Sequence, residues 1–590
     1  MSTSQYRDIS TIDSASYSYI FEQNVSVPLQ SGGVLRCNVY RPKDVDSSRK
    51  YPVIATLGPY GKDVPYSVFN PKSFAELPEE HQTEHSAWET PTPGYWTAQG
   101  YVVVRADEPG IGQSPGVLDF LSKTTVNAFC DLIEWAADQP WSSGKVGLLG
   151  ISYYAGMQWP VAARKPRGLA AIVPWEGFSD MYSEACRHGG ILSNTFFQIW
   201  YARQIAPNQY GLPGRASRNW GPDTIDGDLS PEELAANRAT NPAAYHAFKY
   251  RDNEFFTKTN FRLEDIQVPL LSVANWGGIL LHLRGNVRAF TLASSEFKYL
   301  RFIVGRHDLP FYSPEAVEIQ KSFLDAFLKG KDSLGWAERG KIPAINMVIR
   351  KGNVGFNDPI AEATFLQRDE DEWPLSRTEY TDFFLTEDNN LQFRKPDATR
   401  STDLSYEAFG DGKTAISFDT EPFSQELEIT GHIVAHLNVS ISQGTSETAP
   451  SGMDLFVSLR HFAPDGKEIL YTGSGGEGVP ATKGSLRLAL RQTNPRHPHH
   501  RPWQPHRDYT SADVLPVVCG EIYSVDVELW PTNLVVTAGS KLSFEISSKD
   551  TDGSGLFMHT DPDDRLVTHF YIRIFAQMSI LADHLVTFVV

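Results

Sequence analysis

Short apolar runs alternate with amphipathic segments through the first 330 residues. The runs of buried-strand type cover residues 51–58, 100–107, 145–150, 169–175, 268–274 and 299–305. Residues 125–139 repeat apolar side chains at helical spacing, and residues 281–293 and 313–330 also predict helices. Buried strands that alternate with helices are typical of an α/β fold, so we expect a parallel sheet with helices on both faces.

Residues 178–265 interrupt this alternation. The stretch combines helical pieces with Gly, Pro and Asn turns, and it adds no clear strand to the sheet. An insertion between two strands of such a sheet usually lies over the strand ends. We therefore expect a helical cap.

Beyond about residue 345 the pattern changes to short alternating β-type runs separated by turn residues. This pattern predicts an antiparallel sandwich. The Pro-rich residues 492–516 predict a long loop within it. The chain is thus expected to hold an α/β domain at residues 1–345, with the cap inserted, and an all-β sandwich at residues 346–590.

Composition narrows the class of protein. The 590 residues are 41% hydrophobic and 21% charged, as in soluble globular proteins. The net charge of −18 makes binding to nucleic acid or to an anionic membrane surface unfavourable. Four widely spaced cysteines, a polar N-terminus and the lack of a long apolar run predict a cytoplasmic protein with no membrane span. The sequence leaves the oligomeric state open, and a homo-oligomer is possible.

The sequence LLGISYYAG places Ser152 between a strand and a helix. A sharp turn at this junction exposes the central side chain as a nucleophile, and it needs small residues nearby. Gly150 meets that need, whereas Tyr154 stands where glycine is usual. A structural serine is the alternative, but the strand–turn–helix context favours a nucleophile.

A serine nucleophile needs a base, and in this type of fold the histidine comes last in the chain. His307 follows the run 299–305, so we predict that it is the base. His188, in the cap, is the second choice. His282 lies in a predicted helix, where a packing role is expected.

The acid that orients the base is harder to assign. Its usual place is the loop after residues 268–274, but that loop reads Asn-Trp-Gly-Gly and has no carboxylate. Glu176 follows the preceding strand, and its longer side chain can reach across one more strand spacing. We predict Glu176 as the acid, with Asp308 and Asp180 as alternatives. Helix capping or an ion pair with Arg187 would be its structural role.

Two groups are expected to stabilise the oxyanion. The backbone N–H of Tyr153 follows the nucleophile, and Tyr60 lies in the loop after the first central strand with a hydroxyl that can donate.

At this point the chain resembles the cocaine esterase-like and X-Pro dipeptidyl-peptidase (CocE/NonD) family of serine hydrolases. The resemblance rests on TLGPYGKD, RADEPGIGQSPG, QPWSSGKVGLLG, GISYYAGMQW and ELWPTNLVVTAGSKLSFEISSKD. It implies an α/β-hydrolase core, a helical cap and a C-terminal jelly roll. It also implies Ser152 as nucleophile, His307 as base, and Tyr60 with the Tyr153 amide as oxyanion donors. Better-known members carry the acid where this chain has Gly278, so Glu176 rests on its position alone.

Several functions follow from these residues. The first is hydrolysis of an ester, or less readily an amide, of a small-molecule acyl substrate through an acyl-serine. Acyl transfer or C–C cleavage in secondary metabolism is the second, and a non-catalytic binding protein with this fold is the third. A dipeptidyl-peptidase would need carboxylates for the substrate ammonium, for which Glu184 and Glu89 are candidates.

No cofactor is predicted, because no nucleotide or phosphate-binding motif occurs. His497, His499, His500 and His506 gather within the loop 492–516, but the intervening Pro and Arg residues favour a solvated loop over a metal site. We therefore predict no metal.

Overall fold

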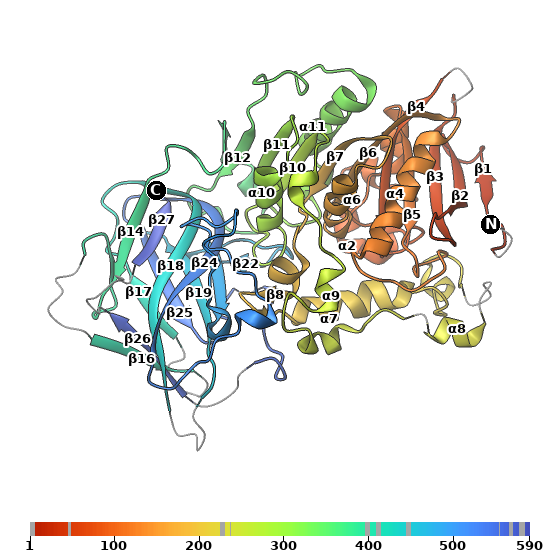
Figure 1. Cartoon of the computed structure of the whole chain (residues 1–590). Coiled ribbons are helices and arrows are strands. Elements are labelled where there is room, and N and C mark those ends of the chain that lie inside the picture. The colour runs from red at the N-terminus through yellow and green to blue at the C-terminus, as the bar shows by residue number, and fades with distance from the viewer. Residues whose placement is uncertain are drawn as a thin grey trace.

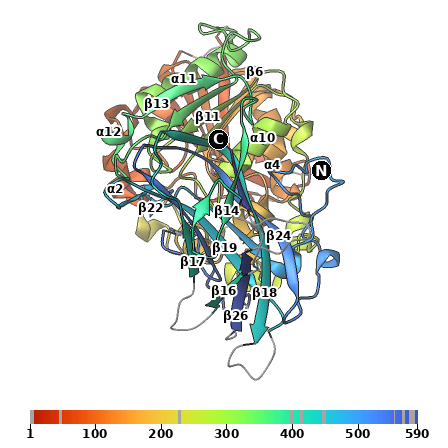
Figure 2. The ribbon, with the colours of Figure 1, turned by 90° about the vertical axis from the view of Figure 1, so that its left-hand side faces the viewer.

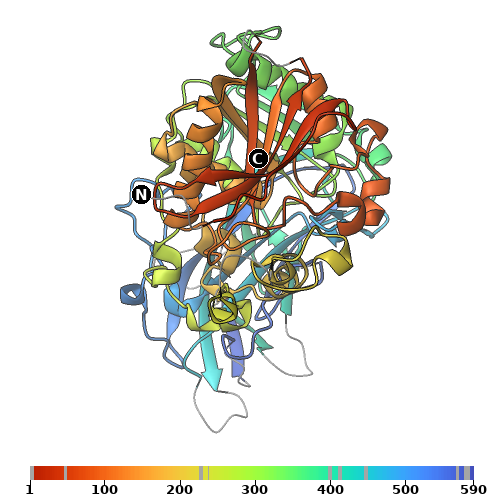
Figure 3. The same cartoon turned by 90° about the vertical axis from the view of Figure 1, so that its right-hand side faces the viewer.

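The computed structural model describes residues 6–44, 49–224, 230–236, 238–395, 402–408, 415–443, 450–553, 555–565, 570–576 and 585–589. An α/β half, built from the first part of the chain, lies beside a β-rich half built from the last part (Figure 1). Seen from the N-terminal side, the first sheet lies in front of the C-terminal strands (Figure 3).

The first sheet has 11 strands in the order β1-β2-β3-β5-β4-β6-β7-β10-β11-β12-β13. All neighbours between β5 and β12 in this order are parallel, which confirms the predicted parallel sheet. The strands are β1 (Thr11–Asp13), β2 (Tyr19–Pro28), β3 (Val34–Pro42), β4 (Tyr51–Gly58), β5 (Val102–Asp107), β6 (Ser142–Ile151), β7 (Leu169–Trp175), β10 (Leu270–Asn275), β11 (Lys298–Ile303), β12 (Ile345–Ile349) and β13 (Leu366–Glu370).

Helices cover both faces of this sheet because its strands are apolar on both sides. Val53 of β4 belongs to the same core as Leu132 of α4, whereas the next residue, Ile54, shares a core with Phe323 of α11. The helices outside the cap are α1 (Tyr66–Phe69), α2 (Pro71–Ala75), η1 (Glu79–His81), α3 (Pro93–Ala98), α4 (Lys123–Asp138), α5 (Tyr153–Gly156), α6 (Gln158–Arg164), α10 (Leu283–Leu292), η8 (Pro310–Tyr312), α11 (Pro314–Leu324), η9 (Asp325–Lys329), α12 (Pro359–Glu362), η10 (Leu488–Leu490) and η11 (Ser511–Asp513).

The insertion between β7 and β10 is mostly helical, as expected for the cap. Its only described strands are the short antiparallel pair β8 (Arg187–His188) and β9 (Ile191–Leu192), which stand apart from the main sheet. Its helices are η2 (Met181–Cys186), α7 (Thr195–Trp200), η3 (Tyr201–Ile205), η4 (Ala206–Asn208), η5 (Ala216–Arg218), α8 (Pro231–Ala236), η6 (Pro242–Ala247), α9 (Glu254–Thr257) and η7 (Leu263–Asp265).

The C-terminal half is all-β, and its large 12-stranded sheet pairs its strands antiparallel (Figure 2). The first sheet runs on through β12 and β13, past residue 345, so the exact domain boundary stays a prediction. The remaining strands are β14 (Tyr380–Leu385), β15 (Leu391–Gln392), β16 (Thr402–Glu407), β17 (Ala415–Asp419), β18 (Leu427–Gln443), β19 (Asp454–Phe462), β20 (Glu468–Ile469), β21 (Tyr471–Thr472), β22 (Gly478–Val479), β23 (Thr482–Arg487), β24 (Ile522–Val536), β25 (Lys541–Ser547), β26 (Phe570–Ala576) and β27 (Leu585–Val589).

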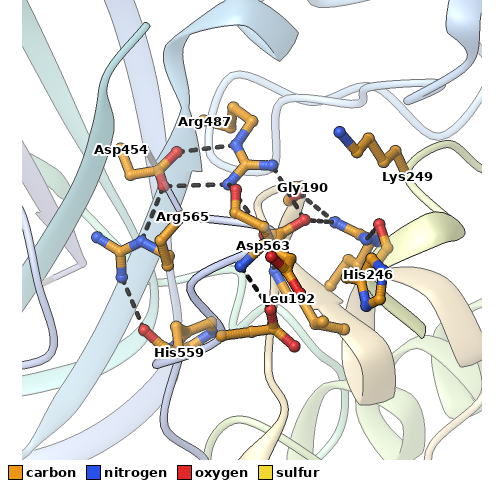
Figure 4. A network of polar contacts seen from close by, with 12 residues as sticks. Gly190, Leu192, His246, Lys249, Asp454, Arg487, His559, Asp563 and Arg565 are labelled. Atoms are coloured by element: carbon orange, nitrogen blue, oxygen red, sulfur yellow. Dashed lines mark hydrogen bonds and ion pairs between the residues drawn. The ribbon is translucent and has the colours of Figure 1, made fainter. Parts of the chain in front are cut away.

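A buried network of charges joins the cap to this β-rich half (Figure 4). Arg187 of β8 contacts Asp564 at 2.7 Å, and both side chains are fully buried. Arg487 of β23 bridges Asp564, at 3.0 Å, and Asp454, at 2.9 Å. Arg565 contacts the same Asp454 at 3.1 Å. Burial alone would raise the pKa of Asp564, but Arg487 and Arg187 lower it, so the carboxylate stays charged.

No helix among the described residues is long and apolar enough to cross a membrane.

We expect Asp564→Ala to destabilise the fold, because it leaves the buried Arg187 guanidinium without its carboxylate and removes one of the two carboxylates that contact Arg487. Loss of one partner of a buried ion pair typically costs about 3–5 kcal/mol of unfolding free energy. Urea denaturation followed by circular dichroism measures this loss. Asp138→Ala is the matched control: it breaks the Arg167–Asp138 pair, whose side chains are both 60% exposed, and should leave the midpoint nearly unchanged. Equal midpoints for the two variants would contradict the structural role of the network.

Candidate active site

Ser152 occupies a strained turn between β6 and α5. Its φ of 60° and ψ of −116° are rare for a residue with a side chain. Its amide donates hydrogen bonds to the carbonyl oxygens of Trp175 and Glu176, both at 3.1 Å. These two bonds tie the turn to the end of β7. The geometry matches a nucleophile elbow.

Two glycines make room for Tyr154, which replaces the usual small residue after the nucleophile. A Cβ at Gly150 would lie 2.6 Å from the Tyr154 Cβ, and a Cβ at Gly58 would lie 2.5 Å from the Tyr154 ring. Both distances are too short for carbon atoms. The sharp turn at Ser152 is therefore compatible with Tyr154, because glycines in β4 and β6 leave room for its side chain.

Glu176 and His307 come together at the carboxyl ends of the parallel strands. Glu176 follows β7 with a φ of 51°, is fully buried, and places Oε2 2.9 Å from Nδ1 of His307. Asn275 of β10 donates from Nδ2 to the other oxygen, Oε1, at 3.1 Å. A Cβ at Gly278 would lie 3.5 Å from Oε2. The Glu176 carboxylate thus lies next to the position from which a residue-278 side chain would extend.

A second carboxylate contacts the opposite nitrogen of His307. Glu89, buried and with a φ of 62°, has Oε1 3.3 Å from Nε2. Burial lowers the pKa of His307, but Glu176 and Glu89 outweigh it and raise the pKa well above its usual value. For Glu89, burial raises the pKa while His307 lowers it. The sequence suggested Glu89 only as a ligand for a substrate ammonium, so this contact is new.

The imidazole nearest to the nucleophile belongs to His282. Its Nε2 lies 3.3 Å from Ser152 Oγ, whereas no hydrogen bond joins Ser152 to His307 among the described residues. The two imidazole rings are parallel, with centroids 4.9 Å apart. Burial and the charge of His307 lower the pKa of His282 well below its usual value. The sequence indicated a packing role for His282; the residue precedes α10 and stacks on His307, and its contact with Ser152 is a feature that the sequence did not indicate.

The other candidates are engaged elsewhere. Asp308 contacts Arg306 at 2.7 Å and also accepts from Ser73, and Asp180 contacts Arg251 at 2.7 Å. His188 of the cap contacts His559 at 3.0 Å. Neither alternative acid touches His307, and the second-choice base does not touch Ser152.

Tyr60 lies beside the nucleophile in a mostly aromatic pocket. Its hydroxyl accepts a hydrogen bond from the Trp200 indole N–H at 3.1 Å, which leaves the Tyr60 O–H to donate. Burial, and then the charge of Glu89, raise the pKa of Tyr60 well above its usual value, so the hydroxyl keeps its proton. The pocket around Ser152 is lined by Tyr60, Phe120, Leu121, Tyr153, Phe178, Met181, Phe196, Phe197, Trp200 and Leu281.

Two clusters hold three potential metal ligands each. One combines His497, His506 and Asp508, and the other combines His246, Asp561 and Asp563. In the first, the imidazoles of His497 and His506 stack with centroids 3.5 Å apart, and His506 contacts Asp508 at 3.1 Å. Both clusters have ordinary protein contacts, and neither adjoins Ser152. The absence of a metal stays a prediction.

The comparisons with known proteins agree with this geometry. Residues 31–307 match the X-Pro dipeptidyl-peptidase (S15 family) model, and residues 340–586 match the X-Pro dipeptidyl-peptidase C-terminal non-catalytic domain. The chain is 23% identical to a cocaine esterase from Rhodococcus sp., in an alignment that covers 90% of this chain and 91% of that protein. A putative Xaa-Pro dipeptidyl-peptidase from Bacillus anthracis is 28% identical, in an alignment that covers 27% of this chain and 29% of that one.

Among solved structures, a CocE/NonD family hydrolase from Staphylococcus aureus superposes with a TM-score of 0.80 at 26% identity, covering 97% of this chain and 94% of that one. An α-amino acid ester hydrolase at 15% identity, with a TM-score of 0.64, covers 100% of this chain and 98% of that one and supports the fold. Together with the two family models, these matches span nearly the whole chain. The chain therefore belongs to the CocE/NonD family of serine hydrolases, which is related to the X-Pro dipeptidyl-peptidases.

Proposed function

We propose that this protein hydrolyses an ester bond of a small, apolar acyl substrate through an acyl-serine at Ser152. The observation that carries the proposal is the strained turn at Ser152, with an imidazole 3.3 Å from its Oγ and an aromatic pocket around it. The names of the relatives, which include a cocaine esterase and a putative serine esterase, support an ester over an amide.

In the first step, Ser152 Oγ attacks the carbonyl carbon and its proton passes to an imidazole. We assign this base to His307, because Glu176 and Glu89 stabilise its protonated form, whereas burial destabilises a protonated His282. For this step, His307 Nε2 breaks its contact with the Glu89 carboxylate and forms a hydrogen bond with the Ser152 hydroxyl. His282 then supports the imidazole by stacking. Catalytic hydrogen bonds often form only in the substrate complex.

The developing oxyanion is stabilised by two donors. The Tyr60 hydroxyl supplies one, because Trp200 already occupies its acceptor side. The backbone N–H of Tyr153, the residue after the nucleophile, supplies the other. The tetrahedral intermediate then collapses: the C–O bond to the alcohol breaks, and the His307 imidazolium gives its proton to the departing alcohol, which leaves the acyl-serine. Water attacks the acyl-serine, the neutral His307 accepts its proton, and Ser152 Oγ leaves with that proton as the carboxylic acid is released.

A dipeptidyl-peptidase is less well supported. Glu89 contacts His307, and Glu184 is fully buried against Arg288, at 3.1 Å, and the Ser179 amide, at 2.7 Å. Glu184 is therefore already bound, and Glu89 is bound in the free protein and is released only when His307 turns to Ser152.

The experiment that tests the proposal compares the wild type with Ser152→Ala on a p-nitrophenyl acyl ester and on the matching anilide. We expect ester hydrolysis with a fluorophosphonate-sensitive serine, and loss of most of a rate enhancement on the order of 10⁶ in the variant. Residual turnover of more than a few per cent, with a native circular dichroism spectrum, would contradict the assignment. Product analysis with an added alcohol shows whether the acyl group goes to water, as expected, or to an acceptor.

The variants His307→Gln and His282→Gln show which of the two histidines acts as the base. We expect His307→Gln to lower kcat by at least about 10³-fold, since it removes the base, and His282→Gln to stay within about tenfold. Because a base acts when deprotonated and the carboxylates raise the pKa of His307, wild-type kcat/KM should rise with pH through an apparent pKa above the usual ~6.5. The reverse order of the two variants would make His282 the base.

A further inference from the structure

A cavity of about 130 Å³ separates α10 from the loop that carries Arg501 to Tyr509 in the β-rich half. On α10 it is lined by Arg284, Val287, Arg288 and Thr291, which recur at the spacing of one helix face. The residues that line this cavity and those that line the pocket at Ser152 have no member in common. The cavity therefore takes no part in the site described above.

The walls of the cavity are strongly cationic. Among the side chains that line it are five arginines but only one carboxylate, Glu528, although the whole chain carries a net charge of −18. The arginines are Arg251, Arg284, Arg288, Arg501 and Arg507.

Not all of this charge is neutralised nearby. Arg251 and Arg288 have carboxylate partners behind the wall, at 2.7 Å and 3.1 Å. Arg501 and Arg507 donate only to backbone carbonyl oxygens among the described residues. Arg284 forms an ion pair with Glu528 at 3.6 Å, which is beyond hydrogen-bond distance, and neither its buried Nε nor Glu528 Oε1 has a hydrogen-bond partner among the described residues. A ligand that accepts from these groups would be stabilised by charge and by hydrogen bonds together.

The buried imidazole of His432 adds a hydrogen-bond donor, and its contacts show which ring nitrogen carries the proton. The indole of Trp373 can only donate, and its Nε1 lies 3.1 Å from Nε2 of His432, so Nε2 accepts. Burial, with a smaller effect of Arg284, lowers the pKa of His432 to about 4, so the imidazole is neutral and its proton is on Nδ1. His432 is only 4% exposed and lines the cavity, and its Nδ1 has no hydrogen-bond partner in the described part of the chain. A buried N–H without an acceptor is costly, and an anion in the cavity would satisfy it.

Aromatic side chains also line the cavity, beside the polar residues Ser183, Thr291, His499, Gln504 and His506. Trp503 is held by stacking on Tyr380, with centroids 5.0 Å apart, and Trp373 and Tyr509 also line the cavity. Val287, Leu292 and two prolines complete an apolar surface. The volume is comparable to the roughly 150 Å³ of a cavity that accommodates one benzene molecule. A small flat group fits beside the cationic groups.

We propose that this cavity is a second ligand site, which binds a small aromatic carboxylate with its charge toward Arg284 and His432 and its ring toward Trp503. The site is independent of the chemistry at Ser152.

The test is isothermal titration of the full-length protein with phenylacetate, with its neutral counterpart phenylacetamide, and with inorganic phosphate. We expect saturable 1:1 binding of phenylacetate, at least about tenfold weaker binding of phenylacetamide, and weak binding of phosphate, which lacks the ring. Arg284→Gln and Trp503→Ala, on opposite walls, should each weaken phenylacetate binding by about tenfold or more. Arg167→Gln is the matched control: it changes an exposed arginine that does not line the cavity, and it should bind phenylacetate like the wild type.

Thermal unfolding of each variant verifies that the fold is intact, and having two wall variants keeps the test valid if one of them fails to fold. Absence of saturable phenylacetate binding would overturn the proposal. So would unchanged affinity in Arg284→Gln and Trp503→Ala, because the ligand would then occupy another site, such as the pocket at Ser152. Equal binding of phenylacetamide, or binding of phosphate in preference to phenylacetate, would contradict the predicted ligand chemistry.

Discussion

The contact between Glu176 and His307 has to span two strand spacings, because β10 lies between β7 and β11 in the sheet. Neighbouring strands are about 4.8 Å apart, so the gap is about 10 Å. The chain crosses it with a long carboxylate side chain, with a backbone turned to a φ of 51° at Glu176, and with no side chain at Gly278 of the intervening loop. Asn275, at the end of the intervening strand β10, donates a hydrogen bond to the Glu176 carboxylate.

This arrangement places six ionisable or polar side chains around one small space. Glu176 and Glu89 contact opposite nitrogens of His307, His282 stacks on the same ring and contacts Ser152, and Tyr60 keeps its proton beside them. The proposed reaction needs His307 to exchange Glu89 for Ser152, so the site in the free protein is one rearrangement away from a Ser–His–Glu triad. The cap supplies Phe196, Phe197 and Trp200 to the aromatic pocket, and Arg187 and Asp564 join the cap to the β-rich half.

Much of this could be predicted from the sequence, for physical reasons that differ from part to part. Strands such as 51–58 and 169–175 were predicted with the bounds that the structure has, because a run buried on both faces is continuously apolar. The strand–turn–helix pattern at Ser152 is local, and so it is visible in the sequence. Glu176 and His307 could be nominated because both follow parallel strands, whose carboxyl ends meet at one edge.

What the sequence could not show depends on distances between segments far apart in the chain. Glu89 lies in an irregular stretch before α3, and nothing in its neighbours indicates that it reaches His307. His282 looked like a helix residue because apolar spacing extends through 281–293, whereas α10 begins one residue later, at Leu283. The cationic cavity is equally non-local, since α10 and the Pro-rich loop around Trp503 meet only in the folded protein.

The central claim, that Glu176 supplies the acid for which the family resemblance points to position 278, is tested most directly by moving the carboxylate. The measurement is kcat for ester hydrolysis in Glu176→Ala, in Gly278→Asp and in the double variant. Glu176→Ala should lower kcat by roughly 10²–10⁴-fold. Adding Gly278→Asp should raise kcat at least tenfold above that of Glu176→Ala, because a Cβ at residue 278 would lie 3.5 Å from the position of Glu176 Oε2. Wild-type activity in Glu176→Ala, or no recovery in a double variant that folds normally, would contradict the account.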